Sequence, residues 1–119
     1  MTEFAKTPAE AHEALYLEAD AAGKHAAAIC KPNPMRIGNE IVEDGVCGFA
    51  WVNIKPATHS FSRWLKANGL GRQDDYAGGV TIWISDYDQS MQRKYAYAAA
   101  FAKVLTDAGY NCYAAERMD

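Results

Sequence analysis

VCGFAWVNI, residues 46–54, is the stretch that decides the fold of this chain. β-Branched and aromatic residues dominate it, and these residue types favour strands. Both faces of the stretch are apolar, because Val52 and Ile54 lie on one face and Trp51 lies on the other. A strand with two apolar faces is typical of the centre of a sheet. The pattern predicts a central strand that is covered on both faces, or covered on one and open to a partner on the other.

Two further strands and two helices are predicted after this strand. Residues 59–68, HSFSRWLKAN, place Phe61, Trp64 and Leu65 on one helix face. VTIWIS at residues 80–85 alternates as a strand does, and NCYAAERM at residues 111–118 predicts a last strand. Residues 88–108 follow the 3.6-residue period of a helix. The apolar positions of that helix are Met91, Tyr95, Ala98, Phe101, Ala102, Leu105 and Ala108.

Before the central strand, the chain predicts one long helix and one short strand. The sequence TPAE at residues 7–10 is a capping box, with Thr7 as N-cap, Pro8 in the first turn and Glu10 three residues after the cap. The helix runs from residue 8 to residue 29 and is rich in alanine, so it either lies close against a flat surface or pairs with another copy. A strand at residues 35–42 and a turn at residues 43–45 predict a hairpin with the central strand.

This order of elements predicts an α/β or α+β fold in a single globular domain spanning residues 1–119. The architecture is a two-layer sandwich, with a three- to four-stranded mixed sheet and three helices. Helical connections between successive strands favour at least partly parallel pairing. The length of 119 residues suffices for one core without disulfides or metals.

Composition predicts a soluble protein of a reducing compartment. The three cysteines, Cys30, Cys47 and Cys112, form no CxxC pair and leave an odd number, which argues against a disulfide framework. We expect all three to be packed as small apolar side chains. No apolar run is long enough to span a bilayer, and no signal-peptide pattern is present at the N-terminus. We therefore expect an intracellular protein that does not act at a membrane.

The charge distribution singles out one segment as a site for an anionic partner. The chain carries a net charge of −3, but no acidic residue occurs between residues 45 and 73. The positive side chains there are Lys55, Arg63, Lys66 and Arg72, and His59 can add another charge. If these cations held phosphates while Trp51 or Trp83 stacked on bases, the segment at residues 55–72 would bind nucleic acid. The alternative is that the tryptophans are core and the cations are a solvated face.

Asp86 and Asp88 stand where a strand meets a helix. Asp86 followed by Gln89 is a capping-box arrangement, and carboxylates in a first helical turn are favoured by the helix dipole. Capping is the favoured interpretation. The alternative is a small enzyme or a nucleotide-binding protein that uses a strand-end edge around Asp86 and His59, which would form if the sheet were parallel.

Sequence motifs for other chemistry are missing. There is no HExxH, EF-hand loop, CxxC pair, GxGxxG or GxxxxGK[ST]. Cys47 with His59 as base would be a nucleophilic pair, but a packed cysteine is the favoured interpretation. We predict no catalytic residue, no metal ligand and no cofactor. The candidate ligand- or partner-binding residues are Lys55, His59, Arg63, Lys66, Arg72, Asp86 and Asp88.

Whole phrases of the chain resemble a group of small proteins encoded by tailed bacteriophages. The phrases are VCGFAWVNI, GGVTIWISDYDQSMQRK and the terminal RMD, and the resemblance covers residues 45–119. It implies a viral protein in the host cytoplasm, and no functional residue carries over from it. The leading interpretation is a non-enzymatic accessory protein that binds a host or phage protein, with a homodimer also expected. Nucleic-acid binding is the second interpretation, and a small enzyme or ligand-binding protein is the third.

Overall fold

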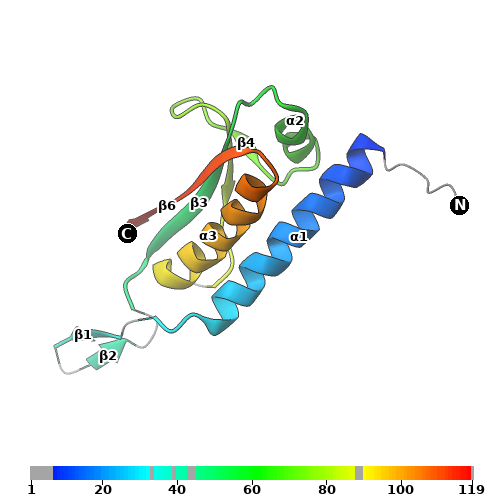
Figure 1. Cartoon of the computed structure of the whole chain (residues 1–119). Coiled ribbons are helices and arrows are strands. Elements are labelled where there is room, and N and C mark those ends of the chain that lie inside the picture. Colours follow the sequence, from blue (N-terminus) through cyan, green and yellow to red (C-terminus); the bar gives the residue numbers. More distant parts are fainter. Residues whose placement is uncertain (1–6, 33, 39, 43–44, 88–89, 119) are drawn as a thin grey trace, which may run out of the picture.

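The computed structural model describes residues 7–32, 34–38, 40–42, 45–87 and 90–118. Its elements, in chain order, are α1 (Pro8–Ile29), β1 (Met35–Ile37), β2 (Glu40–Val42), β3 (Gly48–Lys55), α2 (Ser60–Ala67), β4 (Arg72–Gln73), β5 (Val80–Trp83), α3 (Met91–Asp107) and β6 (Asn111–Met118). The strands β1 and β2 form a separate hairpin, and the other four form one sheet in the order β4-β5-β3-β6. Figure 1 shows the hairpin projecting from the body at the end opposite α2.

The predicted central strand is confirmed, because β3 lies between β5 and β6. Both neighbours pair antiparallel to β3, and β4 pairs antiparallel to β5. The expectation of partly parallel pairing is therefore wrong for the described strands. The connection α3 does join two strands that run in the same direction, β5 and β6, but β3 is inserted between them. The result is a split β-α-β arrangement.

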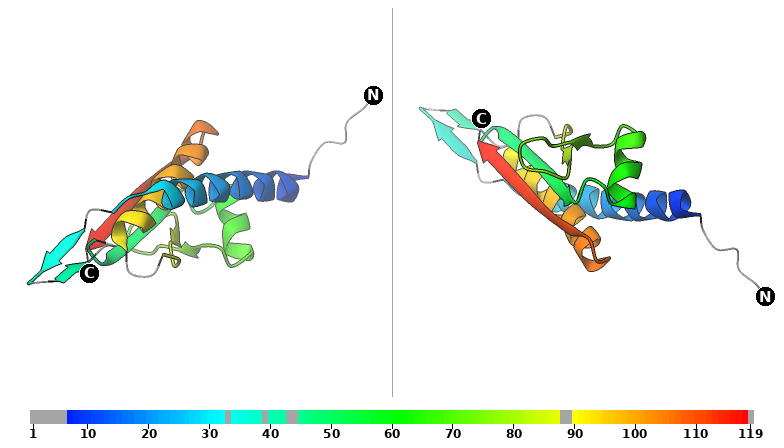
Figure 2. Two further views of the ribbon diagram at one scale, coloured as in Figure 1. Left: turned by 90° about the horizontal axis from the view of Figure 1, so that it is seen from below. Right: turned by 90° about the horizontal axis from the view of Figure 1, so that it is seen from above.

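The described elements form two layers, three helices on one face of the four-stranded sheet, which confirms the predicted two-layer architecture. Helix α3 packs on β3 and β6, and α1 lies beside α3 (Figures 1 and 2). Side chains of β3 that face the helices, such as Val52 and Ile54, are fully buried against Phe101 and Leu105 of α3. The opposite face of the sheet has no helix over it within the described residues. Helix α2 lies at one end of the helical layer, and Phe61 and Leu65 of its predicted apolar face are fully buried.

Helix α1 begins as its sequence predicts and packs through small residues. The Thr7 hydroxyl accepts a hydrogen bond from the Glu10 backbone N–H, and the Glu10 carboxylate accepts one from the Thr7 N–H, which completes the capping box. The buried residues of the helix are Ala19, Gly23 and Ala27, spaced four apart. They form one stripe facing α3, so α1 lies close against a surface of this same chain.

The prediction of one strand at residues 35–42 that pairs with the central strand is wrong. Residues 35–42 do not pair with β3 but turn on themselves, with Gly38 at φ +60° between β1 and β2. The fourth strand of the sheet is instead β4, which lies in the glycine-rich segment GLGRQDDYAGG at residues 69–79. Only two residues of β4 pair, too few for an alternation to be visible in the sequence. Of the turn predicted at residues 43–45, residues 43 and 44 lie outside the described ranges.

Candidate binding surface and adjoining cavity

The uncovered side of the sheet, which we call the open face, carries aromatic and basic side chains. In β3 the alternation places Phe49, Trp51, Asn53 and Lys55 on this side, because the residues between them are buried under the helices. Two residues that lie opposite each other on neighbouring strands point to the same face of the sheet, so the strand register identifies the residues of β4, β5 and β6 that also lie on this side. The open face consists of Phe49, Trp51, Asn53, Lys55, Arg72, Thr81, Trp83, Asn111, Tyr113, Ala115 and Arg117.

The aromatic rings of the open face form one cluster on its two central strands. Trp51 of β3 lies directly across from Trp83 of β5, with ring centroids 4.8 Å apart. Phe49 meets Trp83 edge to face at 6.5 Å. Trp83 is 49% exposed and Phe49 is 36% exposed, which are large fractions for aromatic side chains. The cluster is therefore available for contact with a ligand.

Three cations lie on the open face together with this aromatic cluster. The Lys55 ammonium lies 5.9 Å from the ring centroid of Tyr113, and the Arg117 guanidinium lies 5.5 Å from that of Phe49. Both distances fit cation–π contacts. Arg72 is exposed on β4 at the outer edge of the same face. The described strands present no carboxylate on this face, so its charge is positive although the whole chain is net acidic.

One carboxylate, that of Asp74, lies at the corner of the open face, and it is tied into the β4–β5 turn. It accepts hydrogen bonds from the Ala77 N–H at 2.8 Å, the Tyr76 N–H at 3.0 Å and the Thr81 hydroxyl at 2.9 Å. The backbone N–H of Ala77, followed by the Thr81 hydroxyl, lowers the pKa of Asp74 below its usual value. Asn53, fully buried beneath this turn, donates to the Gly78 carbonyl and to Thr81. These bonds fix the turn to the sheet.

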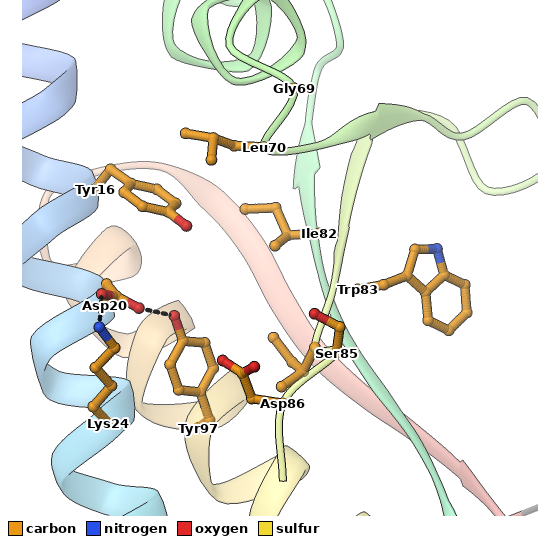
Figure 3. Close-up of a pocket in the computed structure, with 11 residues that line it drawn as sticks. Tyr16, Asp20, Lys24, Gly69, Leu70, Ile82, Trp83, Ser85, Asp86 and Tyr97 are labelled. Carbon is orange, nitrogen blue, oxygen red and sulfur yellow. Dashed lines mark hydrogen bonds and ion pairs between the residues drawn. The ribbon is translucent and has the colours of Figure 1, made fainter. Parts of the chain in front are cut away.

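A cavity of about 410 Å³ opens on the helical side of the sheet, between α1 and β5 (Figure 3). Ile82 and Ile84 form its floor on the sheet, and α1 supplies one wall. The polar and ionisable side chains that line it are Tyr16, Asp20, Lys24, Ser85, Asp86 and Tyr97. A second cavity, of about 430 Å³, lies on the open-face side of β5 and is lined by Arg72, Thr81 and Trp83 among others.

Hydrogen bonds order the α1 wall of the first cavity. The Tyr97 hydroxyl donates to the Asp20 carboxylate, which also pairs with the Lys24 ammonium at 3.0 Å. Burial, and then the hydrogen bond to Asp20, raises the pKa of Tyr97 well above its usual value. Burial alone would raise the pKa of Asp20, but the hydrogen bonds from Tyr97 and Lys24 outweigh it and lower that pKa. Burial, and then the nearby Asp20 charge, raises the pKa of Tyr16.

The prediction that Asp86 caps the long helix is wrong. Helix α3 begins at Met91, and its N-cap is Ser90, whose hydroxyl accepts from the Arg93 N–H at 3.3 Å. Asp86 precedes the helix and is exposed at the first cavity. Asp88 lies outside the described residues, so its predicted role stays a prediction.

The strand-end site predicted around Asp86 and His59 does not form. Because β3 is antiparallel to β5, the end of β3 near His59 and the end of β5 near Asp86 lie at opposite ends of the sheet. His59 is the N-cap of α2, where its Nδ1 accepts from the Phe61 N–H at 3.3 Å. Its ring packs edge to face on Tyr110. A structural role therefore accounts for His59.

The predicted basic segment is divided between the two faces of the molecule. Lys55 and Arg72 lie on the open face, as described above. Arg63 and Lys66 lie on α2 in the helical layer, where the Lys66 ammonium donates to Gln73 at 3.3 Å. Of the four predicted cations, only Lys55 and Arg72 share a face with Trp51 and Trp83. Arg117, which was not in the predicted set, is the third cation of that face.

The expectation that all three cysteines are packed is partly wrong. Cys47 is exposed at the start of β3, whereas Cys30 and Cys112 are half-buried. Burial raises the pKa of the Cys112 thiol. Cys47 and His59 are separated by the length of β3, so they form no nucleophilic pair. His12 bonds to the Ser60 hydroxyl at 2.7 Å, while His25 is exposed. The described residues contain no cluster of three or more His, Cys, Asp or Glu side chains that could hold a metal ion.

Several residues of these sites were missed from the sequence. Tyr113 and Arg117 belong to the open face only because β6 pairs beside β3. The sequence does contain a signal for the cavity beside α1, because Tyr16, Asp20 and Lys24 follow one another at intervals of four and so share one helix face.

Comparison with known proteins does not assign the chain to a family. No protein-family model, no curated protein and no solved structure matches it. Within the part of the chain that the structure describes, no helix has the length and apolar character needed to cross a bilayer. The chemistry of the open face and of the cavities is therefore the basis for the proposals that follow.

Proposed function

We propose that this protein is a non-enzymatic binding module that holds single-stranded nucleic acid on the open face of its sheet. The observation that carries the proposal is the ring cluster of Phe49, Trp51 and Trp83 on the two central strands, in which Phe49 and Trp83 are exposed. Arg117 lies over Phe49, and Lys55 lies over Tyr113 on the same face. The resemblance to tailed-phage proteins adds a setting, that of a small accessory protein in the cytoplasm of an infected host.

The chemistry of the open face matches that of a single strand. Each base has a flat π-face, and stacking on an aromatic side chain contributes roughly 1–3 kcal/mol per base. Four-stranded sheets that recognise single-stranded RNA stack two or three bases on aromatic side chains of this kind. In a duplex the base faces are already stacked on one another, so a flat ring cluster selects unpaired bases. Lys55, Arg72 and Arg117 lie on the same face of the sheet as the rings, where cations would contact the phosphates between such bases.

A protein partner or a second copy of the chain is the competing occupant of this face. The sequence favours a protein partner, and exposed aromatic and arginine side chains are common in protein interfaces. The cations favour nucleic acid, since a two-fold contact between two copies would bring Lys55, Arg72 and Arg117 of both copies together. The third interpretation, an enzyme using Asp86 and His59, loses its basis because the two residues lie at opposite ends of the sheet.

The proposal is tested by titrating the full chain with single-stranded oligonucleotides of about ten nucleotides, within the usual site sizes. Tryptophan fluorescence should be quenched as bases stack on Trp51 and Trp83. Duplex of the same sequence should bind more weakly. If three cations contact phosphates, the slope of log affinity against log salt should be about −2.

Variants separate stacking from charge. Trp51→Ala should weaken binding by about five- to a hundredfold, the equivalent of one lost stacked base. Lys55→Ala should weaken binding and make the salt slope shallower, whereas Lys103→Ala is the matched control, because Lys103 pairs with Asp107 on the exposed side of α3. Absence of binding at low salt would refute the proposal. If no oligonucleotide binds but a purified partner protein does, and Trp51→Ala abolishes that binding, the open face is a protein interface instead.

A further inference from the structure

The edge of β5 that faces away from β3 is unpaired beyond Thr81, the last residue of β5 that pairs with β4. Strand β4 pairs only with Val80 and Thr81. The Ile84 N–H donates to the Ala50 carbonyl of β3 at 3.0 Å. Alternate residues of an antiparallel strand direct their backbone groups to opposite neighbours, so Trp83 and Ser85 direct theirs away from β3. Within the described ranges no backbone group accepts or donates a hydrogen bond there, and both residues are exposed.

The two cavities lie on either side of this edge. The cavity of about 410 Å³ is on the helical side, and the cavity of about 430 Å³ is on the open-face side. Gly69, Leu70, Trp83 and Ser85 line both. Successive side chains of a strand point to opposite faces of a sheet. A strand added beside Trp83 and Ser85 would therefore direct alternate side chains into one cavity and then the other.

The helical-side cavity sets the charge of its occupant. It holds two carboxylates, Asp20 and Asp86, and one ammonium, that of Lys24, which is already paired with Asp20. Asp86 has no hydrogen bond or ion pair within the described part of the chain, and Figure 3 shows it beside Tyr97 at the bottom of the cavity. The Tyr16 hydroxyl points into the same space. A lysine or arginine side chain fits this combination of carboxylate and phenol oxygens.

We propose that an extended polypeptide segment of another protein adds to the β5 edge at Trp83 and Ser85, with a basic side chain in the cavity lined by Asp20 and Asp86. Strand addition uses backbone hydrogen bonds for affinity and alternate side-chain pockets for specificity. A nucleic acid does not fit this edge, because it lacks the alternating N–H and C=O groups and because the carboxylates repel its phosphates. This site adjoins the proposed nucleic-acid surface and shares Arg72, Thr81 and Trp83 with it, whereas the β5 edge and the cavity lined by Asp20 and Asp86 lie outside that surface.

The test is a selection of short random peptides, displayed at a surface, against the full chain. Enriched peptides should carry lysine or arginine at one position and an aromatic or acidic residue at the position directly beside it. Neighbouring side chains of the added strand enter different cavities. The best peptide is then synthesised, together with a copy that is N-methylated at the residues facing the edge. N-Methylation removes the donors without changing charge, so it should weaken binding about tenfold or more.

Variants of the protein identify the site. Asp86→Lys should abolish binding of the basic peptide, and Ser85→Pro should do so by removing the edge N–H, whereas Ser85→Ala should bind as the wild type does. Lys55→Ala, which alters the open face but lines neither cavity, should also leave peptide binding unchanged and so separates this site from the proposed nucleic-acid surface. Failure to enrich any peptide would overturn the proposal. So would binding that tolerates both N-methylation and Asp86→Lys.

Discussion

At the scale of single residues, the contact between Tyr97 and Asp20 joins two helices that are far apart in sequence. Tyr97 on α3 is buried, and its hydroxyl donates to the carboxylate of Asp20 on α1. Lys24 holds the same carboxylate from the next turn of α1. The contact fixes one wall of the helical-side cavity, because both residues line it. The charge on Asp20 makes this a hydrogen bond of the stronger kind.

Tyr97→Phe should lower the free energy of unfolding by about 1.5–3 kcal/mol at neutral pH, the value of a hydrogen bond to a charged group. The pKa of Asp20 is lowered in the fold, so this stabilisation is present above the usual pKa of 3.8 and is lost as the pH falls through the folded value. The pKa of Tyr97 is raised in the fold, so above pH 10.0 the Tyr97 hydroxyl ionises in the unfolded chain while it stays protonated in the folded protein. Stability is therefore also lost as the pH rises above 10.0.

Urea unfolding of the wild type and of Tyr97→Phe across this pH range measures the effect. The difference between the two proteins should be largest between these limits and should shrink towards both. Tyr95→Phe is the matched control, since Tyr95 is 36% exposed on the same helix. A difference that stays constant from acid to alkali would show that the hydroxyl contributes through packing and not through Asp20.

At the scale of secondary-structure elements, the small residues of α1 decide how closely it packs on α3. Gly23 faces the Tyr97 ring, and a Cβ atom built on it would lie 2.6 Å from Cδ2 of that ring. Helix α1 has few large apolar side chains, so close approach replaces the burial of bulk. This explains why an alanine-rich helix, weak by its own apolar content, is ordered against the body of the protein.

Gly23→Ala should therefore destabilise the protein, although alanine favours a helix by about 1 kcal/mol over glycine. Overpacking against a ring costs roughly 1–3 kcal/mol, which outweighs that gain. Urea melts should show an earlier midpoint for Gly23→Ala and little change for Glu18→Ala, an exposed position of the same helix. A later midpoint for Gly23→Ala would mean that the two helices separate easily.

The buried face of α3 differs in part from the face that its sequence predicts. Ala98, Phe101, Ala102 and Leu105 are buried as expected. Tyr95, predicted in the core, is partly exposed, while Tyr97 and Lys94 are buried in its place. The Lys94 ammonium donates to the Gly48 carbonyl at 3.2 Å. The face is wider towards α1 than a helix lying on a sheet alone would need, because α3 packs on the sheet and on α1 at once.

Truncation of Phe101 and of Tyr95 to alanine tests which of these two side chains belongs to the buried face of α3. Phe101→Ala removes a fully buried ring and should cost roughly 3–5 kcal/mol, a large part of the stability of a small domain. Tyr95→Ala should cost less than about 1 kcal/mol, because much of the ring already contacts water. Equal losses in urea unfolding would show that Tyr95 belongs to the core after all.

At the scale of the whole molecule, the helices cover one face of the sheet, and no helix of the described residues covers the other (Figure 2). The open face is positive while the chain as a whole has a net charge of −3. A two-fold contact through this face would place like charges opposite one another and would have to desolvate them. The sequence alone predicts a homodimer, but this distribution of charge opposes one built on the open face.

Light scattering at micromolar concentration and low salt should therefore return the monomer mass of 13.1 kDa. High salt screens the cations, so any tendency to pair through the open face should become visible there. A dimer at low salt that Trp51→Ala dissociates would contradict this prediction and would support the homodimer that the sequence favours. A dimer insensitive to Trp51→Ala would use another surface.

Local patterns in the sequence determined most of the elements of this protein. The capping box at Thr7 and Glu10 starts α1 where predicted, and the alternation in residues 46–54 and 80–85 predicts β3 and β5. These predictions succeed because the direction of each side chain along a helix or strand is fixed by the backbone dihedral angles. The two-layer class also follows, since each apolar face requires another to cover it.

The tertiary structure alone decided which residues meet. Strand order, the insertion of β3 between β5 and β6, and the short β4 depend on contacts between distant segments, which leave no period in the sequence. The same order separates His59 from Asp86 and brings Arg117 to Phe49. Which face of the sheet stays open was equally undecided, because Trp51 is as apolar as the core residues beside it. Only the side on which α1 and α3 pack makes it a surface residue.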